Sequence, residues 1–208
     1  MNTSELTLLS KTDDAVYRGD YQGKEAIYKF TNGETRQAEC LKVIGKPELY
    51  HHTTQDVVVP DGDRYQTLTI EEYIPGLALR GEGTIHHHEG VGFYYQADFV
   101  TYDQIPVEMR KPLFVAILKE SQRIEALGIV RQGFLDKTII SKDWMDGKIG
   151  TVTFFDYRWA GAPKEANHTD RLTHFEMFDY LLDLPAQAYP EGYRHFTHQD
   201  MLAYLESV

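Results

Sequence analysis

Polar and apolar residues alternate in short runs through the first third of the chain, and turn residues separate these runs. Segments 15–19 and 25–30 flank the turn sequence Asp20-Tyr21-Gln22-Gly23-Lys24, and this arrangement predicts a β-hairpin. Asp61-Gly62-Asp63 is a second turn sequence that separates two β-prone runs. The further strands predicted by these patterns lie at residues 6–10, 56–60 and 65–73.

Helical spacing appears first at residues 34–44, where Ala38 and Leu41 fall on one side, and the helix is predicted to stop at Gly45-Lys46-Pro47. Residues 81–106 are rich in glycine and histidine and predict a loop-rich insertion. Later helices are predicted at 107–127, 175–184 and 199–208. Strands that precede helices in this way indicate an α+β fold.

Composition narrows the class of protein. The chain has 208 residues, is 42% hydrophobic and 25% charged, and has no apolar run near the roughly 20 residues of a membrane span. A single cysteine, Cys40, and the absence of a secretory signal favour a reducing, cytoplasmic location. The net charge of −11 argues against nucleic acid as a partner. We therefore expect a soluble protein that binds neither membranes nor nucleic acids.

The most informative segment runs from Gly128 to Ile140. It follows an amphipathic run and precedes two apolar runs, 138–140 and 149–155, that flank an Asp-Gly turn; the second run ends at Asp156. This order resembles that of protein kinases, which usually read H-R-D-x-x-x-x-N in the catalytic loop and D-F-G after the hairpin.

The chain therefore resembles a minimal and degenerate protein-kinase-like domain, similar to small bacterial effector kinases and to kinases of the tRNA-modification type. The resemblance implies a bilobal fold, with a strand-rich N-lobe of one sheet and one helix at residues 1–75. A reduced helical C-lobe at residues 76–208 would contain the segment that resembles a catalytic loop.

Ala26-Ile27-Tyr28-Lys29 resembles the kinase third-strand motif V-A-I-K. The resemblance implies that Lys29 reaches the phosphates of ATP and forms an ion pair with a glutamate of the following helix. Glu39 is the expected partner, and Glu34 is the alternative. Without the resemblance, Lys29 would be an ordinary surface lysine on an edge strand.

Residues 71–76 resemble the kinase hinge, whose backbone binds adenine, so Glu71 and Tyr73 become candidate nucleotide-binding residues. The other interpretation of this segment is a strand that ends in a Pro-Gly turn. The places of the kinase phosphate-covering glycines are taken by Leu9, Lys11 and Asp14. The carboxylate of Asp14 would disfavour the binding of a triphosphate.

The catalytic positions are altered. Gly133 stands where the resemblance places the catalytic base, and Thr138 stands where it places the asparagine ligand of a second metal ion. Asp156 takes the place of the magnesium-binding aspartate, with a capping or ion-paired aspartate as the other interpretation. Asp136 is the candidate for a displaced base, unless it is simply a solvated loop residue.

These observations predict a pseudokinase with weak ATP and Mg²⁺ binding and little or no phosphotransfer, acting as a regulatory or binding module for an unidentified protein partner. Two alternatives stay open: an active atypical kinase with its base at Asp136, and an unrelated α+β binding protein. The three consecutive histidines at 86–88 match no zinc framework, so we interpret them as loop residues.

Overall fold

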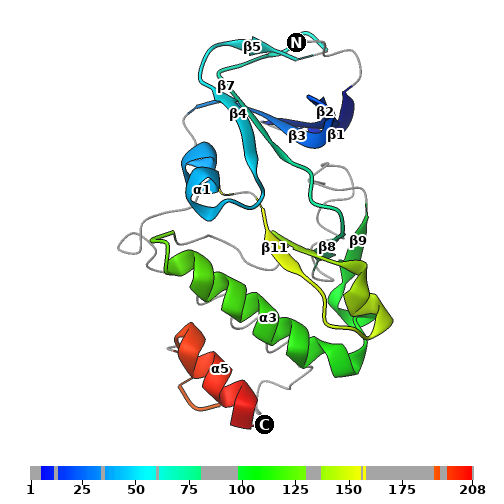
Figure 1. The fold of residues 1–208 in the computed structure, drawn as a ribbon, viewed down its shortest axis with the longest axis vertical. Helices are drawn as coiled ribbons and strands as arrows, with labels where there is room; N and C mark the ends of the chain where they lie inside the picture. Colours follow the sequence, from blue (N-terminus) through cyan, green and yellow to red (C-terminus); the bar gives the residue numbers. More distant parts are fainter. Residues whose placement is uncertain are drawn as a thin grey trace. The chain divides into compact units, whose positions relative to one another are not determined.

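The computed structural model describes residues 6–11, 14–33, 36–59, 61–80, 98–129, 137–155, 157, 190–192 and 196–207. The described part of the chain divides into two compact units (Figure 1). The N-terminal unit contains the described residues up to Pro75 together with Tyr157, and the C-terminal unit contains the rest.

The N-terminal unit is built on an antiparallel sheet of five strands, as far as its described residues go, in the order β1-β2-β3-β7-β4. These strands are β1 (Thr7–Lys11), β2 (Ala15–Tyr21), β3 (Lys24–Thr31), β4 (Leu49–Thr53) and β7 (Thr67–Glu72). The predicted hairpin is confirmed as β2 and β3. Its turn residues Gln22 and Gly23 have φ of 57° and 81°, as the twisted two-residue hairpin turn requires.

The strand pair predicted across Asp61-Gly62-Asp63 is divided differently in the structure. β5 (Val57–Val58) pairs with the short β6 (Arg64–Tyr65), while β7 leaves this hairpin and pairs with β3 and β4. Sequence reasoning missed β4, because its residues are half-buried or exposed and lack a clear alternation of apolar and polar side chains.

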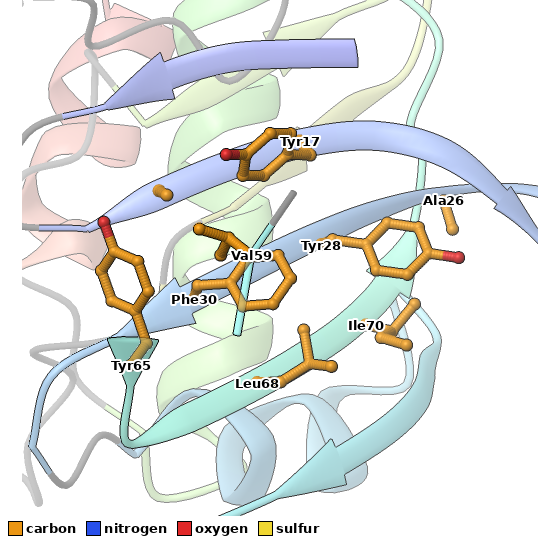
Figure 2. Close-up of a cluster of buried hydrophobic side chains, with 9 residues drawn as sticks. Tyr17, Ala26, Tyr28, Phe30, Val59, Tyr65, Leu68 and Ile70 are labelled. Carbon is orange, nitrogen blue, oxygen red and sulfur yellow. The ribbon is translucent and has the colours of Figure 1, made fainter. Parts of the chain in front are cut away.

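One face of the five-stranded sheet carries an apolar cluster (Figure 2). Seven of the buried side chains come from the sheet and define the face that we call the outer face: Ala15, Tyr17, Ala26, Tyr28, Phe30, Leu68 and Ile70. Val59 and Tyr65, from the segment with β5 and β6, complete the cluster. The Phe30 ring lies edge-on to Tyr17, with 5.6 Å between ring centroids, and 6.1 Å from the Tyr65 ring. The segment that contains β5 and β6 thus supplies part of the cover of this face.

The predicted first helix is confirmed as α1 (Gln37–Ile44). It buries Ala38 and Leu41, and it ends at Gly45, whose φ of 77° lets its N–H donate to the Leu41 carbonyl at 2.8 Å. The glycine stop in the sequence therefore has a direct structural cause.

The C-terminal unit contains a four-stranded sheet among its described residues, in the order β11-β10-β8-β9. The strands are β8 (Leu77–Arg80), β9 (Phe99–Thr101), β10 (Thr138–Ile140) and β11 (Val152–Phe154), and only β8 and β9 of these run parallel. The predicted hairpin after the loop is confirmed as β10 and β11. Its connection holds a 3₁₀ helix, η2 (Lys142–Asp146), whose Trp144 is fully buried.

Two of the later predicted helices are confirmed as α3 (Val107–Glu125) and α5 (His198–Ser207), which pack against each other. The third, at 175–184, lies outside the described residues. The predicted loop-rich insertion reaches too far, because its end forms β9 and the 3₁₀ helix η1 (Tyr102–Gln104). Residues 81–97 are outside the described part. No helix within the described ranges is long and apolar enough to cross a membrane.

We predict that Gly76→Ala lowers stability more than Gly147→Ala. Both glycines have positive φ, but a Cβ on Gly76 would lie 2.5 Å from the Ile140 carbonyl oxygen, whereas a Cβ on Gly147 would meet nothing within 4 Å. The overpacking adds about 1–3 kcal/mol to the loss at Gly76. Urea unfolding of both variants measures the difference, and equal losses would contradict the close approach of Gly76 to β10.

Candidate functional site

The inner face of the five-stranded sheet is buried yet polar. Successive strand residues point to opposite faces, so the neighbours of the apolar cluster in β3 and β7 point away from it. These inner-face residues are Ile27, Lys29, Thr31, Thr67, Thr69 and Glu71, and each is at most 8% exposed. Burying polar side chains costs free energy unless they are paired, so this face is the candidate functional surface of the sheet.

Lys29 and Glu71 form an ion pair on the inner face. The Lys29 ammonium lies 3.2 Å from Glu71 Oε1, and the two side chains are 8% and 0% exposed. Their strands are neighbours in the sheet, and Lys29 stands opposite Thr69 while Glu71 stands opposite Ile27. Because β3 lies between β2 and β7, the interpretation of Lys29 as a surface lysine on an edge strand is wrong.

The predicted ion pair between Lys29 and Glu39 is also wrong. The Glu39 side chain is 75% exposed and lies 3.7 Å from Arg36. Residues two apart on a helix are turned by about 200°, so Glu39 points away from the sheet when Gln37 points toward it. Glu34, the alternative partner, lies outside the described residues. Within the described residues, the carboxylate that forms an ion pair with Lys29 is that of Glu71 on strand β7, and Glu39 on helix α1 points away.

Gln37 is the residue of α1 that reaches the ion pair. Its Nε2 donates to Glu71 Oε2 at 2.6 Å, and its Oε1 accepts a hydrogen bond from the Tyr157 backbone N–H at 2.5 Å. Gln37 is 3% exposed and Tyr157 is 1% exposed. Sequence reasoning missed Gln37, although it shares a helical side with Leu41 and Ile44 at i+4 and i+7. That spacing was the available signal.

Two further polar contacts belong to this face. His52 Nδ1 lies 3.2 Å from the Thr69 hydroxyl, and burial lowers the pKa of His52, assisted by the nearby Lys42 and His51. The buried Thr31 hydroxyl has no hydrogen-bond partner among the residues that the structure describes. The inner face thus carries an extended row of polar groups around Lys29.

Tyr73, the second residue from the predicted hinge, lies at the end of the sheet. Its backbone N–H donates to the Glu25 carbonyl at 3.3 Å, and the Arg18 guanidinium lies 4.1 Å from the centre of its ring. This N–H is engaged within the sheet rather than directed at a ligand.

The end of β1, where kinases place phosphate-covering glycines, is anchored in this protein. The Lys11 ammonium forms ion pairs with Asp61 and Asp63, the latter at 2.6 Å. These hydrogen bonds raise the pKa of Lys11 and lower the pKa of Asp61. Lys11 therefore ties β1 to the turn between β5 and β6.

Thr138 is the one predicted catalytic-loop residue in the described part of the chain. It begins β10, stands opposite Phe154 and is fully buried. Gly133, Asp136 and Asp156 lie outside the described residues. Within the described ranges, no group of three or more His, Cys, Asp or Glu side chains could hold a metal ion.

Comparison with solved structures finds a similar fold in a viral kinase. The chain is similar to the kinase PK-1 of Cydia pomonella granulovirus, with a TM-score of 0.53 and 12% identity, over 96% of this chain and 78% of that one. No family model and no curated protein matches the chain. At this identity the likeness concerns the fold.

The protein thus has a bilobal, protein-kinase-like α+β fold with a strand-rich N-terminal sheet. Lys29, the buried lysine of β3, belongs to the N-terminal sheet of this fold.

We expect Glu71→Ala to lower the free energy of unfolding by about 3–5 kcal/mol, because it leaves the buried Lys29 ammonium without this carboxylate. Glu39→Ala should change it by less than about 0.5 kcal/mol, because the removed carboxylate is exposed. Chemical denaturation of the two variants checks this contrast. A larger loss for Glu39→Ala than for Glu71→Ala would restore the helix glutamate as the partner of Lys29.

Proposed function

We propose that this protein is a kinase-like binding module that holds a nucleotide weakly at Lys29 and transfers phosphate very slowly or not at all. The observation that carries the proposal is the buried Lys29–Glu71 ion pair on the inner face of a kinase-like sheet. In protein kinases, a lysine on the third strand donates hydrogen bonds to the phosphate oxygens of ATP.

The chemistry of the Lys29 ammonium fits a phosphate ligand. A lysine ammonium carries a positive charge and three N–H donors, which are the groups that phosphate oxygens bind. Glu71 holds the side chain in place, which reduces the entropy lost when a ligand binds. The same carboxylate also offsets the positive charge, so the attraction for a triphosphate is weakened.

Other features of the N-terminal unit support weak binding. Close backbone approach to phosphates requires glycines, and Leu9, Lys11 and Asp14 stand at those places. The Lys11 ammonium is already engaged by Asp61 and Asp63. Asp14 adds a carboxylate that repels a triphosphate. Magnesium would be needed to offset this charge, and Asp156 is the residue proposed to hold it.

The sequence of the catalytic loop supports slow transfer. Gly133 has no side chain with which to accept a proton, and a general base contributes about 10²–10⁴-fold. Thr138 offers one hydroxyl where an asparagine would bind a metal ion, and this side chain is fully buried. A site that keeps the lysine but lacks the base suits a regulatory role, in which a nucleotide stabilises a surface for a protein partner.

The first test is the thermal stability of the protein with ATP and Mg²⁺. A ligand at a concentration equal to its Kd stabilises by about 0.4 kcal/mol, so we expect the midpoint to rise by about 1–2 °C at millimolar ATP. The rise should vanish in Lys29→Ala.

Lys24→Ala is the matched control, because Lys24 lies on the same strand, carries the same charge and is 59% exposed. It should keep the shift. An equal shift in wild type and both variants would place the nucleotide elsewhere and remove the basis of the proposal.

The second test is phosphotransfer from radiolabelled ATP to the protein itself or to a generic substrate. We expect no incorporation above background for the wild type. The double variant Gly133→Asp with Thr138→Asn should raise it if the remaining site is competent. Robust incorporation by the wild type that Asp136→Asn abolishes would favour the alternative, an active kinase with a displaced base.

A further inference from the structure

We propose that Gln37 is a positioning residue that joins the Lys29–Glu71 ion pair to the backbone after Asp156, and that positions 37 and 71 must together carry one carboxylate and one carboxamide. The ligand part of this inference rests on the proposed function, whereas the network itself does not. Nothing in the sequence resemblance assigns a role to Gln37.

The inference follows from the donors and acceptors of the network. Glu71 accepts at both oxygens, from Lys29 at Oε1 and from Gln37 at Oε2. Gln37 donates through Nε2 and accepts through Oε1 from the Tyr157 N–H, which can only donate. The orientation of the Gln37 amide is therefore fixed by its two neighbours.

Single substitutions break this pattern. In Glu71→Gln, the NH₂ groups of positions 37 and 71 face each other, so two donors lie together without an acceptor. Flipping the Gln37 amide by 180° would instead place its NH₂ group against the Tyr157 N–H, which is also a donor. In Gln37→Glu, two carboxylates face each other where a donor and an acceptor lie 2.6 Å apart. Each change leaves buried polar groups without partners, which is the costly case.

Exchanging the two residues restores the contacts of position 71 with Lys29, of position 71 with position 37, and of position 37 with the Tyr157 N–H. In the double variant Gln37→Glu with Glu71→Gln, the new amide at 71 accepts from Lys29 and donates to the new carboxylate at 37. That carboxylate also accepts from the Tyr157 N–H. The count of charges is unchanged, and the negative charge moves from strand β7 to helix α1.

The arrangement has a consequence for the proposed nucleotide site. Glu71, which forms an ion pair with Lys29, lies on a neighbouring strand of the same sheet, so this contact is set by the pairing of β3 with β7. Helix α1 contributes a neutral amide, which ties the ion pair to the residue next to Asp156, the proposed magnesium ligand. Gln37 thereby positions two parts of the proposed site relative to each other within the N-terminal unit.

The test is a cycle of four proteins: wild type, Gln37→Glu, Glu71→Gln and the exchange variant. We expect each single change to lower the unfolding midpoint by about 4 °C or more, and the exchange variant to lie within about 2 °C of wild type. The control exchange, Gln37→Glu with Glu72→Gln, should not recover, because the Glu72 carboxylate bonds to the Glu48 N–H and not to Gln37.

Additive losses in the exchange variant, or recovery in the control exchange, would overturn the inference. If a single variant fails to fold, folding of the exchange variant alone supports the network, and failure of both contradicts it. The shift with ATP and Mg²⁺ is measured on the same proteins. If the exchange variant recovers stability but ATP does not raise the unfolding midpoint of the wild type, the proposed function is rejected and the network stands. If the losses of stability are additive but ATP does raise the wild-type midpoint, the network is rejected and the proposed function stands.

Discussion

The burial of the Lys29 charge is the constraint on which the rest of the N-terminal unit depends. An ammonium that is 8% exposed is tolerated only beside a carboxylate with good geometry, and Glu71 supplies it at 3.2 Å. Glu71 in turn needs a donor for its second oxygen, and this requirement fixes Gln37 at the start of α1. The buried Lys29 ammonium is therefore matched by Glu71 on the neighbouring strand, and Glu71 is matched by Gln37 on the side of α1 that faces the sheet.

The two faces of the five-stranded sheet differ in their chemistry. The outer face carries the aromatic and aliphatic cluster, which stabilises the strands by burial of apolar surface (Figure 2). The inner face of β3 and β7 is lined largely by lysine, glutamate and threonines. Apolar residues of similar volume would often be as stable there, so stability alone does not account for this polar row.

Local sequence patterns predicted a large part of the fold. The Gln22-Gly23 turn, the glycine after α1 and the hairpin after the loop are set by residues close in the chain, and all three are present. β4 was missed because its half-buried and exposed residues show no clear alternation, and its place at the sheet edge is set by pairing with β7. The partner of Lys29 was misassigned for a similar reason: the register of β3 and β7 brings Glu71 inward, and no local pattern encodes that register. Gly133, Asp136 and Asp156 lie outside the described residues and stay predictions.

We propose that the buried Lys29 ammonium is the group that contacts a nucleotide. NMR of protein labelled at lysine side chains tests it directly, with the Lys29 signal assigned by comparison with Lys29→Arg. We predict that titration with ATP and Mg²⁺ shifts the Lys29 signal while the signal of Lys24 stays in place. An unchanged Lys29 signal at saturating nucleotide, or shifts confined to exposed lysines, would contradict it.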